Sequence, residues 1–422
     1  MLLGMNHRSS APTSNASHRL GRRVTKILLL SGLGLLLIGI ACAITIVRWP
    51  GLAARGADEL RKLIGDTAVA QLESTVYGFQ DNVNQQRYAL GLKKVESPWA
   101  AQPVIVLKPQ TSVRVAASSG ASKALQAVHD TGIVTDSTAV ATDLWKPGDV
   151  TPFTQADGEG KWQPYIQDDR GRVTAYRTFL SPDPKRPYAA IAVVAFDLHA
   201  SRLNFVLGSQ EPKSKVKIER PGTIPASDNQ PGKLLAVFNG GWKAQHGHFG
   251  VMVNGTVVLP PVADAATLAM DADGTLRIGK WGQDGLVTKN TVIWRQNNVP
   301  LINNGEINPR TENMSIADWG SALNGNVAVW RSALGISQDG NTLFYAAGDS
   351  ALVSAMTKAL SAVDAYNAMQ LDVNNYWVHF DAVRTENGAL KPDALFPAMA
   401  NSDNDRYLKG FTRDFFYVTA NL

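Results

Sequence analysis

The chain has 422 residues, of which 45% are hydrophobic and 18% are charged, an ordinary composition for a globular protein. The formal net charge of +5 belongs to the N-terminus, because residues 1–50 hold six Lys or Arg and no Asp or Glu, whereas the remainder holds 35 basic and 36 acidic residues. This nearly neutral remainder gives no support for nucleic-acid binding. The single cysteine, Cys42, excludes an internal disulfide, a Cys-ligated zinc site and a thiol nucleophile from it.

Residues 27–47 form the first predicted element, an uncharged run of 21 residues. At about 1.5 Å per residue, a helix of this length crosses a hydrocarbon layer of about 30 Å. Basic residues before the run favour a cytoplasmic N-terminus. We therefore predict a cytoplasmic basic tail at 1–26, a single-pass anchor at 27–47 in the inner (plasma) membrane, and an extracytoplasmic body, in the periplasm where the cell has one.

Two processing alternatives are compatible with the same sequence. Ala41-Cys42-Ala43 has the small-x-small form of a signal-peptidase site. Gly39-Ile40-Ala41-Cys42 resembles a lipoprotein box, although Gly39 stands where a larger aliphatic residue is expected. The apolar run continues beyond either cut, which favours an uncleaved anchor, and all three alternatives place the body outside the cytoplasm.

Residues 48–160 are predicted to form a membrane-proximal stalk and a small accessory region. A loose helical period over 56–87 indicates a helix, residues 103–107 suggest a strand, and the Pro- and Gly-rich stretch 145–164 indicates a linker or long loop. A weaker hypothesis is that residues 56–150 bind a protein partner.

From about residue 171 the sequence pattern predicts short apolar strands separated by turns. The near-continuous apolar runs 189–196 and 234–238 are typical of strands buried on both faces. Asp-Gly pairs at 273–274 and 339–340 predict two hairpin turns. The first pair superficially resembles a calcium loop, but the later carboxylates of an EF-hand are lacking, so the turn is favoured.

The segment 331–373 predicts a strand, an Asp-Gly turn, a returning antiparallel strand at 342–347, a helix capped near Ser350, and a further strand at 368–373. A strand–helix–strand crossover should lay the last strand parallel to 342–347. Asp372, Arg331 and the helix N-terminus would then meet at one edge of the sheet. Such an edge is a common place for anionic ligands.

Four motifs in order resemble the phosphodiester glycosidase family, and the resemblance spans about 171–422. They are Phe238-Asn239-Gly240-Gly241-Trp242, His246-Gly247-His248-Phe249-Gly250, Arg331-Ser332-Ala333-Leu334-Gly335 and Leu371-Asp372. The resemblance implies an α+β fold, a mixed β-sheet with flanking helices, and hydrolysis of a sugar 1-phosphodiester at the anomeric carbon. The positions that carry over from the family are Asn239, Gly240, Gly241, His246, Gly247, Arg331 and Asp372.

One departure from the family pattern follows Asp372. The family continues with a turn rich in glycine and serine, whereas this chain continues Val373-Asn374-Asn375-Tyr376-Trp377. Glycines would let the backbone approach a phosphate closely. Side chains here would fill or reshape that space, so a non-catalytic protein that binds glycans or supports envelope assembly is the alternative function.

The expected roles follow from the chemistry of an oxocarbenium-like transition state, which a nearby carboxylate stabilises. Asp372 is expected to face the sugar, and Arg331 with the backbone of Gly240 and Gly241 is expected to hold the phosphate. His246 would assist proton transfer or bind substrate, and Glu306 is a second carboxylate candidate. No metal and no cofactor is expected, since His246 and His248 lack a third ligand at a telling distance.

These residues also have ordinary structural interpretations. Asn239-Gly240-Gly241 can be a simple turn, and Arg331 can belong to a surface ion pair. Asp372 can cap a loop, Glu306 can be a solvated loop residue, and the aromatic pair at 376–377 can be packing rather than a sugar platform.

Overall fold

The computed structural model describes residues 50–99, 145–312, 319, 327–401 and 403–421. The chain divides into two compact units, Met1–Val69 and Ala70–Leu422. Within the described ranges no helix is long and apolar enough to cross a membrane. The predicted tail at 1–26, the predicted anchor at 27–47 and the predicted strand at 103–107 lie outside the described residues.

The stretch that follows the predicted anchor in the sequence is helical, as the 56–87 period predicts. Helix α2 (Pro50–Ile64) and helix α3 (Asp66–Ala89) are separated at Gly65. Gly65 has a φ of +84°, in the left-handed region that glycine adopts without a steric penalty. The stretch is therefore two helices rather than one.

Three β-sheets make up the body. The eight-stranded sheet has the order β1 (Gln163–Gln167), β2 (Val173–Leu180), β3 (Ile191–Asp197), β14 (Thr342–Ala351), β13 (Val329–Ile336), β15 (Asn367–Val373), β11 (Pro300–Asn303) and β12 (Glu306–Ile307). One five-stranded sheet has the order β17 (Ala389–Ala394), β16 (Phe380–Glu386), β5 (Leu234–Asn239), β18 (Phe415–Ala420) and β4 (Ser201–Val206). The other has the order β7 (Thr256–Leu259), β6 (Val251–Val253), β10 (Thr291–Gln296), β8 (Ala266–Asp271) and β9 (Leu276–Lys280). The first sheet begins at Gln163, before the expected domain boundary at 171.

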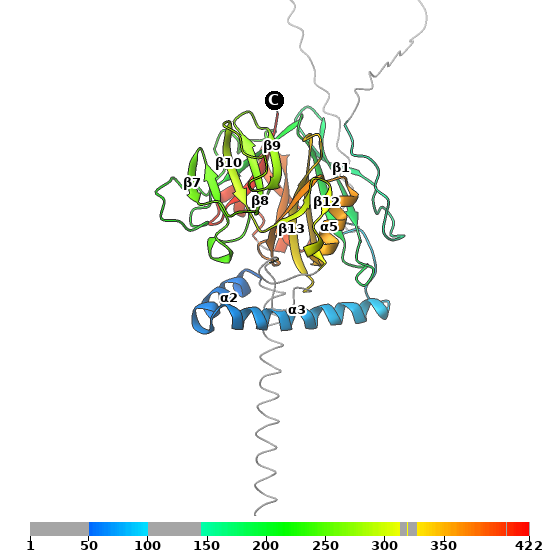
Figure 1. Cartoon of the computed structure of the whole chain (residues 1–422). Helices are drawn as coiled ribbons and strands as arrows, with labels where there is room; N and C mark the ends of the chain where they lie inside the picture. The colour runs from blue at the N-terminus through cyan, green and yellow to red at the C-terminus, as the bar shows by residue number, and fades with distance from the viewer. Residues whose placement is uncertain (1–49, 100–144, 313–318, 320–326, 402, 422) are drawn as a thin grey trace, which may run out of the picture. The chain divides into compact units, whose positions relative to one another are not determined.

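Few helices accompany these sheets. Besides α2 and α3 the described residues contain α5 (Val353–Ala362), α6 (Arg406–Lys409) and the short 3-10 helices η1 (Ala244–His246), η2 (Pro309–Thr311) and η3 (Met399–Asn401). Figure 1 shows α5 beside the eight-stranded sheet. The sheet-rich α+β class expected from the sequence is confirmed.

The central strands of the eight-stranded sheet are buried on both faces, and β3 shows how. Ile191, Val193 and Ala195 point into a core that includes Met356 of α5. The alternate residues of β3 point into the core shared with the two five-stranded sheets. Side chains alternate between the faces of a strand, so a strand covered on both sides must be apolar throughout. The prediction for 189–196 is confirmed.

Both predicted Asp-Gly hairpins are present. Strand β8 pairs antiparallel with β9, and β13 pairs antiparallel with β14. Asp271 accepts hydrogen bonds from Arg277 at 2.5 Å and from the Thr291 hydroxyl at 2.8 Å. Its carboxylate therefore connects neighbouring strands of the sheet.

The predicted crossover is correct in direction but not in neighbour. Strand β15 runs parallel to β14, yet β13 lies between them and pairs antiparallel with both. All the described strand pairs are antiparallel, so parallel strands of this sheet occur only as non-neighbours. The predicted cap is wrong: Ser350 belongs to β14, and α5 begins after Leu352 without a side-chain cap.

Candidate active site

Asn239 ends strand β5 and ties this sheet to the eight-stranded sheet. Its Nδ2 donates to the Ser332 hydroxyl at 3.0 Å, and its Oδ1 accepts from the Tyr345 hydroxyl and the His379 backbone N–H, both at 3.2 Å. Ser332 in turn accepts the backbone N–H of Asp372 at 3.2 Å. Asn239 therefore fixes the position of the strand that carries Asp372.

Gly240 and Gly241 allow the turn after β5 to pass close to other groups. A Cβ at Gly240 would lie 2.5 Å from the Asp414 carbonyl oxygen, and a Cβ at Gly241 would lie 2.8 Å from Nη2 of Arg295. The Gly240 N–H donates to that same Asp414 carbonyl at 3.1 Å. This N–H, expected to hold a phosphate, is thus already used within the protein.

Asp372 lies near the end of β15, 5% exposed, and forms an ion pair with Nη2 of Arg413. The same Nη2 donates to the Gly241 carbonyl at 2.7 Å. Burial raises the pKa of Asp372 to about 6, against the opposing effect of the Arg413 charge. Asp372 and the Gly-Gly turn therefore meet, as predicted, and Arg413 is the group that joins them.

The turn after Asp372 covers this pair with an aromatic ring. The Trp377 ring centroid lies 4.4 Å from Cζ of Arg413 and 5.0 Å from Nζ of Lys243. Asn374, with φ +91°, opens the turn and accepts the Tyr376 N–H on its side-chain oxygen at 2.9 Å. The side chains expected to reshape this space are indeed placed over the Arg413 guanidinium.

Arg331 does not join the site, which corrects the prediction that it holds a phosphate. It is fully buried, and its guanidinium donates to the Ala351 carbonyl at 3.0 Å and to the Trp319 and Val327 carbonyls at 3.2 Å. Its neighbour Ser332 points to Asn239 on the other face of the sheet, and adjacent side chains on a strand alternate. Burial lowers the pKa of Arg331 to about 9.

Glu306 also lies apart from Asp372. It begins the exposed edge strand β12, which pairs with β11. This hairpin lies at the start of β15, because the Gly305 N–H donates to the Tyr366 carbonyl at 2.7 Å. From Asn367 to Asp372 the strand rises about 17 Å at ~3.4 Å per residue. Glu306 therefore lies toward the opposite end of β15 from Asp372, and its role as a second carboxylate stays a prediction.

His246 and Gly247 lie on the exposed loop that leaves the Gly-Gly turn. His246 ends η1, with its Nε2 at 3.2 Å from Nε2 of Gln245. Gly247 has a φ of +131°, and a Cβ there would lie 2.5 Å from the Phe249 ring. Gly247 thus has a conformational role, while the role of His246 toward a substrate stays a prediction.

A second buried ion pair lies beside the first. Nε of Arg295 donates to Asp414 at 2.8 Å, and its Nη2 donates to the Trp242 carbonyl at 2.7 Å. Because Asp414 follows Arg413 directly, both pairs lie at the start of β18. The Asp414 charge contributes to the raised pKa of Asp372.

A buried charged chain supports the turn at 374–377. Arg406 donates to the Tyr376 carbonyl at 2.9 Å and to Nδ1 of His379 at 2.8 Å. An Arg only donates, so Nδ1 of His379 is the acceptor, and Nε2–H donates to Asp381 at 2.8 Å. Burial lowers the pKa of His379, in keeping with this neutral tautomer.

Arg413 and the pairs around it escaped sequence reasoning. The sequence signal for these residues is the position of the Arg413-Asp414 dipeptide directly before the last apolar strand. This dipeptide lies outside the four motifs. Among the described residues, no group of three or more His, Cys, Asp or Glu side chains is arranged to hold a metal ion.

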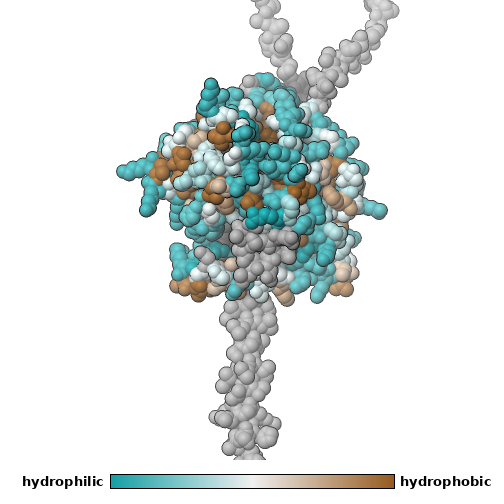
Figure 2. Space-filling model, viewed as in Figure 1, coloured by the Kyte–Doolittle hydropathy of each residue, from teal (hydrophilic) through white to brown (hydrophobic). Residues whose placement is uncertain are grey.

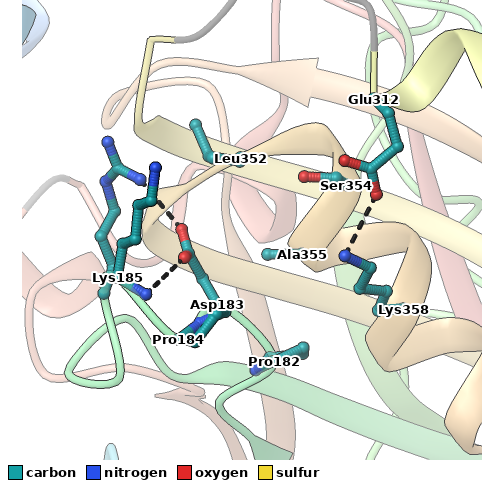
Figure 3. Close-up of a pocket in the computed structure, with 10 residues that line it drawn as sticks. Pro182, Asp183, Pro184, Lys185, Glu312, Leu352, Ser354, Ala355 and Lys358 are labelled. Atoms are coloured by element: carbon teal, nitrogen blue, oxygen red, sulfur yellow. Dashed lines mark hydrogen bonds and ion pairs between the residues drawn. The ribbon is translucent and has the colours of Figure 1, made fainter.

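A cavity of about 360 Å³ lies elsewhere, between the β2–β3 loop and α5 (Figure 3). Figure 3 shows Lys358 of α5 paired with Glu312, at 3.1 Å, and Asp183 bonded within its own loop. None of the predicted site residues lines it. It belongs to the face of the eight-stranded sheet that α5 covers.

A family model matches part of the chain. Residues 232–372 match the family model described as phosphodiester glycosidase, which confirms the predicted resemblance. No curated protein sequence matches the chain.

Solved structures show low similarity to the chain. The catalytic domain of zebrafish N-acetylglucosamine-1-phosphodiester alpha-N-acetylglucosaminidase, auto-inhibited by its pro-peptide, is 14% identical, with 66% of this chain and 88% of that chain covered and a TM-score of 0.38. A hypothetical protein from Synechocystis is 9% identical, covering 61% and 64%, with a TM-score of 0.34. A putative exported protein from Burkholderia pseudomallei is 10% identical, covering 55% and 74%, with a TM-score of 0.28.

Proposed function

We propose, from the match of residues 232–372 to the phosphodiester glycosidases, that the body of this protein hydrolyses a sugar 1-phosphodiester. The observation that carries the proposal is the buried pair of Asp372 and Arg413 beside the Gly-Gly turn. A carboxylate at the anomeric carbon stabilises the oxocarbenium-like transition state, and a guanidinium holds the departing phosphate.

The two side chains divide the work. Asp372 acts as nucleophile or electrostatic stabiliser in its ionised form, which Arg413 favours. Both described hydrogen bonds of Arg413 are made by Nη2, so Nε and Nη1 supply donors for a phosphate. Arg413 thus takes the phosphate-holding role that the sequence suggested for Arg331.

The test is hydrolysis of a panel of sugar 1-phosphodiesters by the purified protein. Asp372→Asn and Arg413→Gln are expected to lose most of kcat, whereas Asp284→Asn, on an exposed turn, is expected to retain it. Turnover that both site variants keep at the level of the unaltered protein would remove this site from the reaction.

The alternative is a glycan-binding protein without turnover, which one observation favours. Trp377 covers Arg413, and Asp372 is almost fully enclosed, so the site as it stands is narrow. Affinity for glycans without hydrolysis across the panel supports this alternative, and gain of turnover in Trp377→Gly would show that the ring alone closes the site.

We also propose that residues 27–47 anchor the chain in the inner (plasma) membrane with the body outside the cytoplasm. The support is the uncharged run of 21 residues with cations before it. A single cysteine introduced by Gln338→Cys in a Cys42→Ser chain should react with a membrane-impermeant maleimide in intact cells. Reaction only after lysis would place the body inside.

A further inference from the structure

One side of helix α3 packs on the body. Asp81 accepts from Nε and Nη2 of Arg186 at 2.8 and 2.6 Å, and the rings of Tyr88 and Tyr188 lie 5.6 Å apart. Tyr77 packs against buried valines of the body. Positions 77, 81, 84 and 88 recur at the helical spacing and form one face.

The opposite side of α3 is apolar and exposed. Leu72 is 48% exposed, Phe79 68%, Val83 36% and Leu90, which continues the last turn through its N–H to Gln86, 74%. At about 100° per residue, these four side chains fall within roughly 20° of one line, and the body-facing residues lie about 120° to 180° away from it. We name Leu72, Phe79, Val83 and Leu90 the apolar stripe.

The apolar stripe carries no acidic residue. Figure 2 shows a mainly hydrophilic face on which hydrophobic residues are scattered, some of them along its lower edge. Positions 76 and 86, which complete the same line, are Val and Gln, so no acidic residue interrupts it. A row of exposed apolar side chains along one side of a helix is typical of an interaction surface.

We infer that the apolar stripe lies in the interfacial layer of the lipid bilayer that anchors the chain. The inference rests on the proposed anchor at 27–47, which ends only 19 residues before α3 begins at Asp66. This short connection keeps α3 near the membrane surface. Arg87 and Lys94, both exposed, follow the stripe and would contact lipid phosphates.

The experiment uses the full chain in vesicles that contain anionic lipid and bromine-labelled acyl chains. In a Cys42→Ser background, an environment-sensitive fluorophore is attached at Phe79→Cys and, as a control, at Gln338→Cys in the β13–β14 turn. The bromolipids should quench the label at position 79 strongly and the label at position 338 hardly at all.

Two charge variants refine the test with the label moved to Leu72→Cys. Phe79→Asp should lose most of the quenching, whereas Asn82→Asp, which adds the same charge at an exposed position off the stripe, should keep it. Retention in Phe79→Asp would overturn the inference.

The possible failures are distinguishable. A chain that does not float with the vesicles contradicts the anchor, and sugar-phosphodiester turnover is measured separately. A chain that floats with label 79 unquenched overturns the stripe proposal while the anchor stands. If the emission of the label at position 79 indicates an apolar environment but bromolipids do not quench it, a second copy or a protein partner covers the stripe. That result also overturns the stripe proposal.

Discussion

Arg331 and Arg413 are both buried guanidinium groups, and their partners separate their roles. Arg331 is surrounded by backbone carbonyls and the Gln370 side chain, whereas Arg413 pairs with the carboxylate of Asp372 and with Gly241. A guanidinium held by carbonyls stabilises the fold. A guanidinium that pairs with the carboxylate of a candidate site can also bind a ligand there.

For Arg413→Gln we expect the acidic limb of the pH–activity profile to shift to higher pH. In the proposed reaction Asp372 acts in its ionised form, so kcat/KM should rise with pH through about 6, the raised pKa of this buried carboxyl. Loss of the adjacent positive charge raises that pKa further, by about 1 unit or more. Carboxyl NMR of Asp372 measures the same shift without turnover, and an unmoved pKa would contradict the pairing.

For Arg331→Ala we expect lower stability as the primary effect. Three carbonyls lose their donor and a cavity forms, which costs about 3 kcal/mol or more of the free energy of unfolding. Urea denaturation measures it. Normal stability with a large increase in KM would instead restore Arg331 to the phosphate site.

At the scale of elements, the turn after β15 depends on the buried chain of Asp381, His379 and Arg406. Asp381 and His379 belong to or directly precede β16, and Arg406 begins α6. Their hydrogen bonds end on the Tyr376 carbonyl. Two separate elements thus set the position of a turn that covers Arg413.

For Arg406→Met we expect the free energy of unfolding to fall by about 3 kcal/mol, because a buried charged network loses one member. The amides of Tyr376 and Val378, bonded to Asn374, should also exchange faster. Arg384→Met is the matched control, since its half-buried pair with Asp393 is worth about 1 kcal/mol or less. Equal losses in both variants would refute this role for Arg406.

The elements were predictable where a local rule decides them. Asp-Gly turns fix hairpins, and an all-apolar run such as 189–196 fixes a doubly covered strand. The order of β14, β13 and β15 was not predictable. The local pattern is the same whether β15 lies directly beside β14 or β13 lies between them. Arg331 was misplaced for a related reason: its spacing does not reveal which face of the strand it occupies. Arg413 was missed because it meets Asp372 only through β18.

At the scale of the whole molecule, the described body joins three sheets in one core and holds α3 through few polar contacts. The principal one is the pair of Asp81 and Arg186, both nearly buried. Arg186 also pairs with Asp183 at 3.0 Å. The body therefore keeps a partner for this arginine even when α3 opens.

For Asp81→Ala we expect local opening of α3 without unfolding of the sheets. The free energy of opening, from hydrogen exchange of residues 70–89, should fall by about 1–3 kcal/mol. Exchange in β3 and β14 should stay unchanged, and Asn82→Ala should alter neither. Unchanged protection of α3 in Asp81→Ala would show that the ring contacts suffice.

Val373 follows Asp372 directly and packs against Val327 and Val329, the same two valines that Tyr77 of α3 covers. Val327 and Val329 therefore connect the residue after Asp372 to the side of α3 that packs on the body. If the apolar stripe rests on lipid as inferred, a sugar phosphodiester whose aglycone is held in the same membrane would reach the body by lateral diffusion. Encounter would then depend on surface density rather than on bulk concentration.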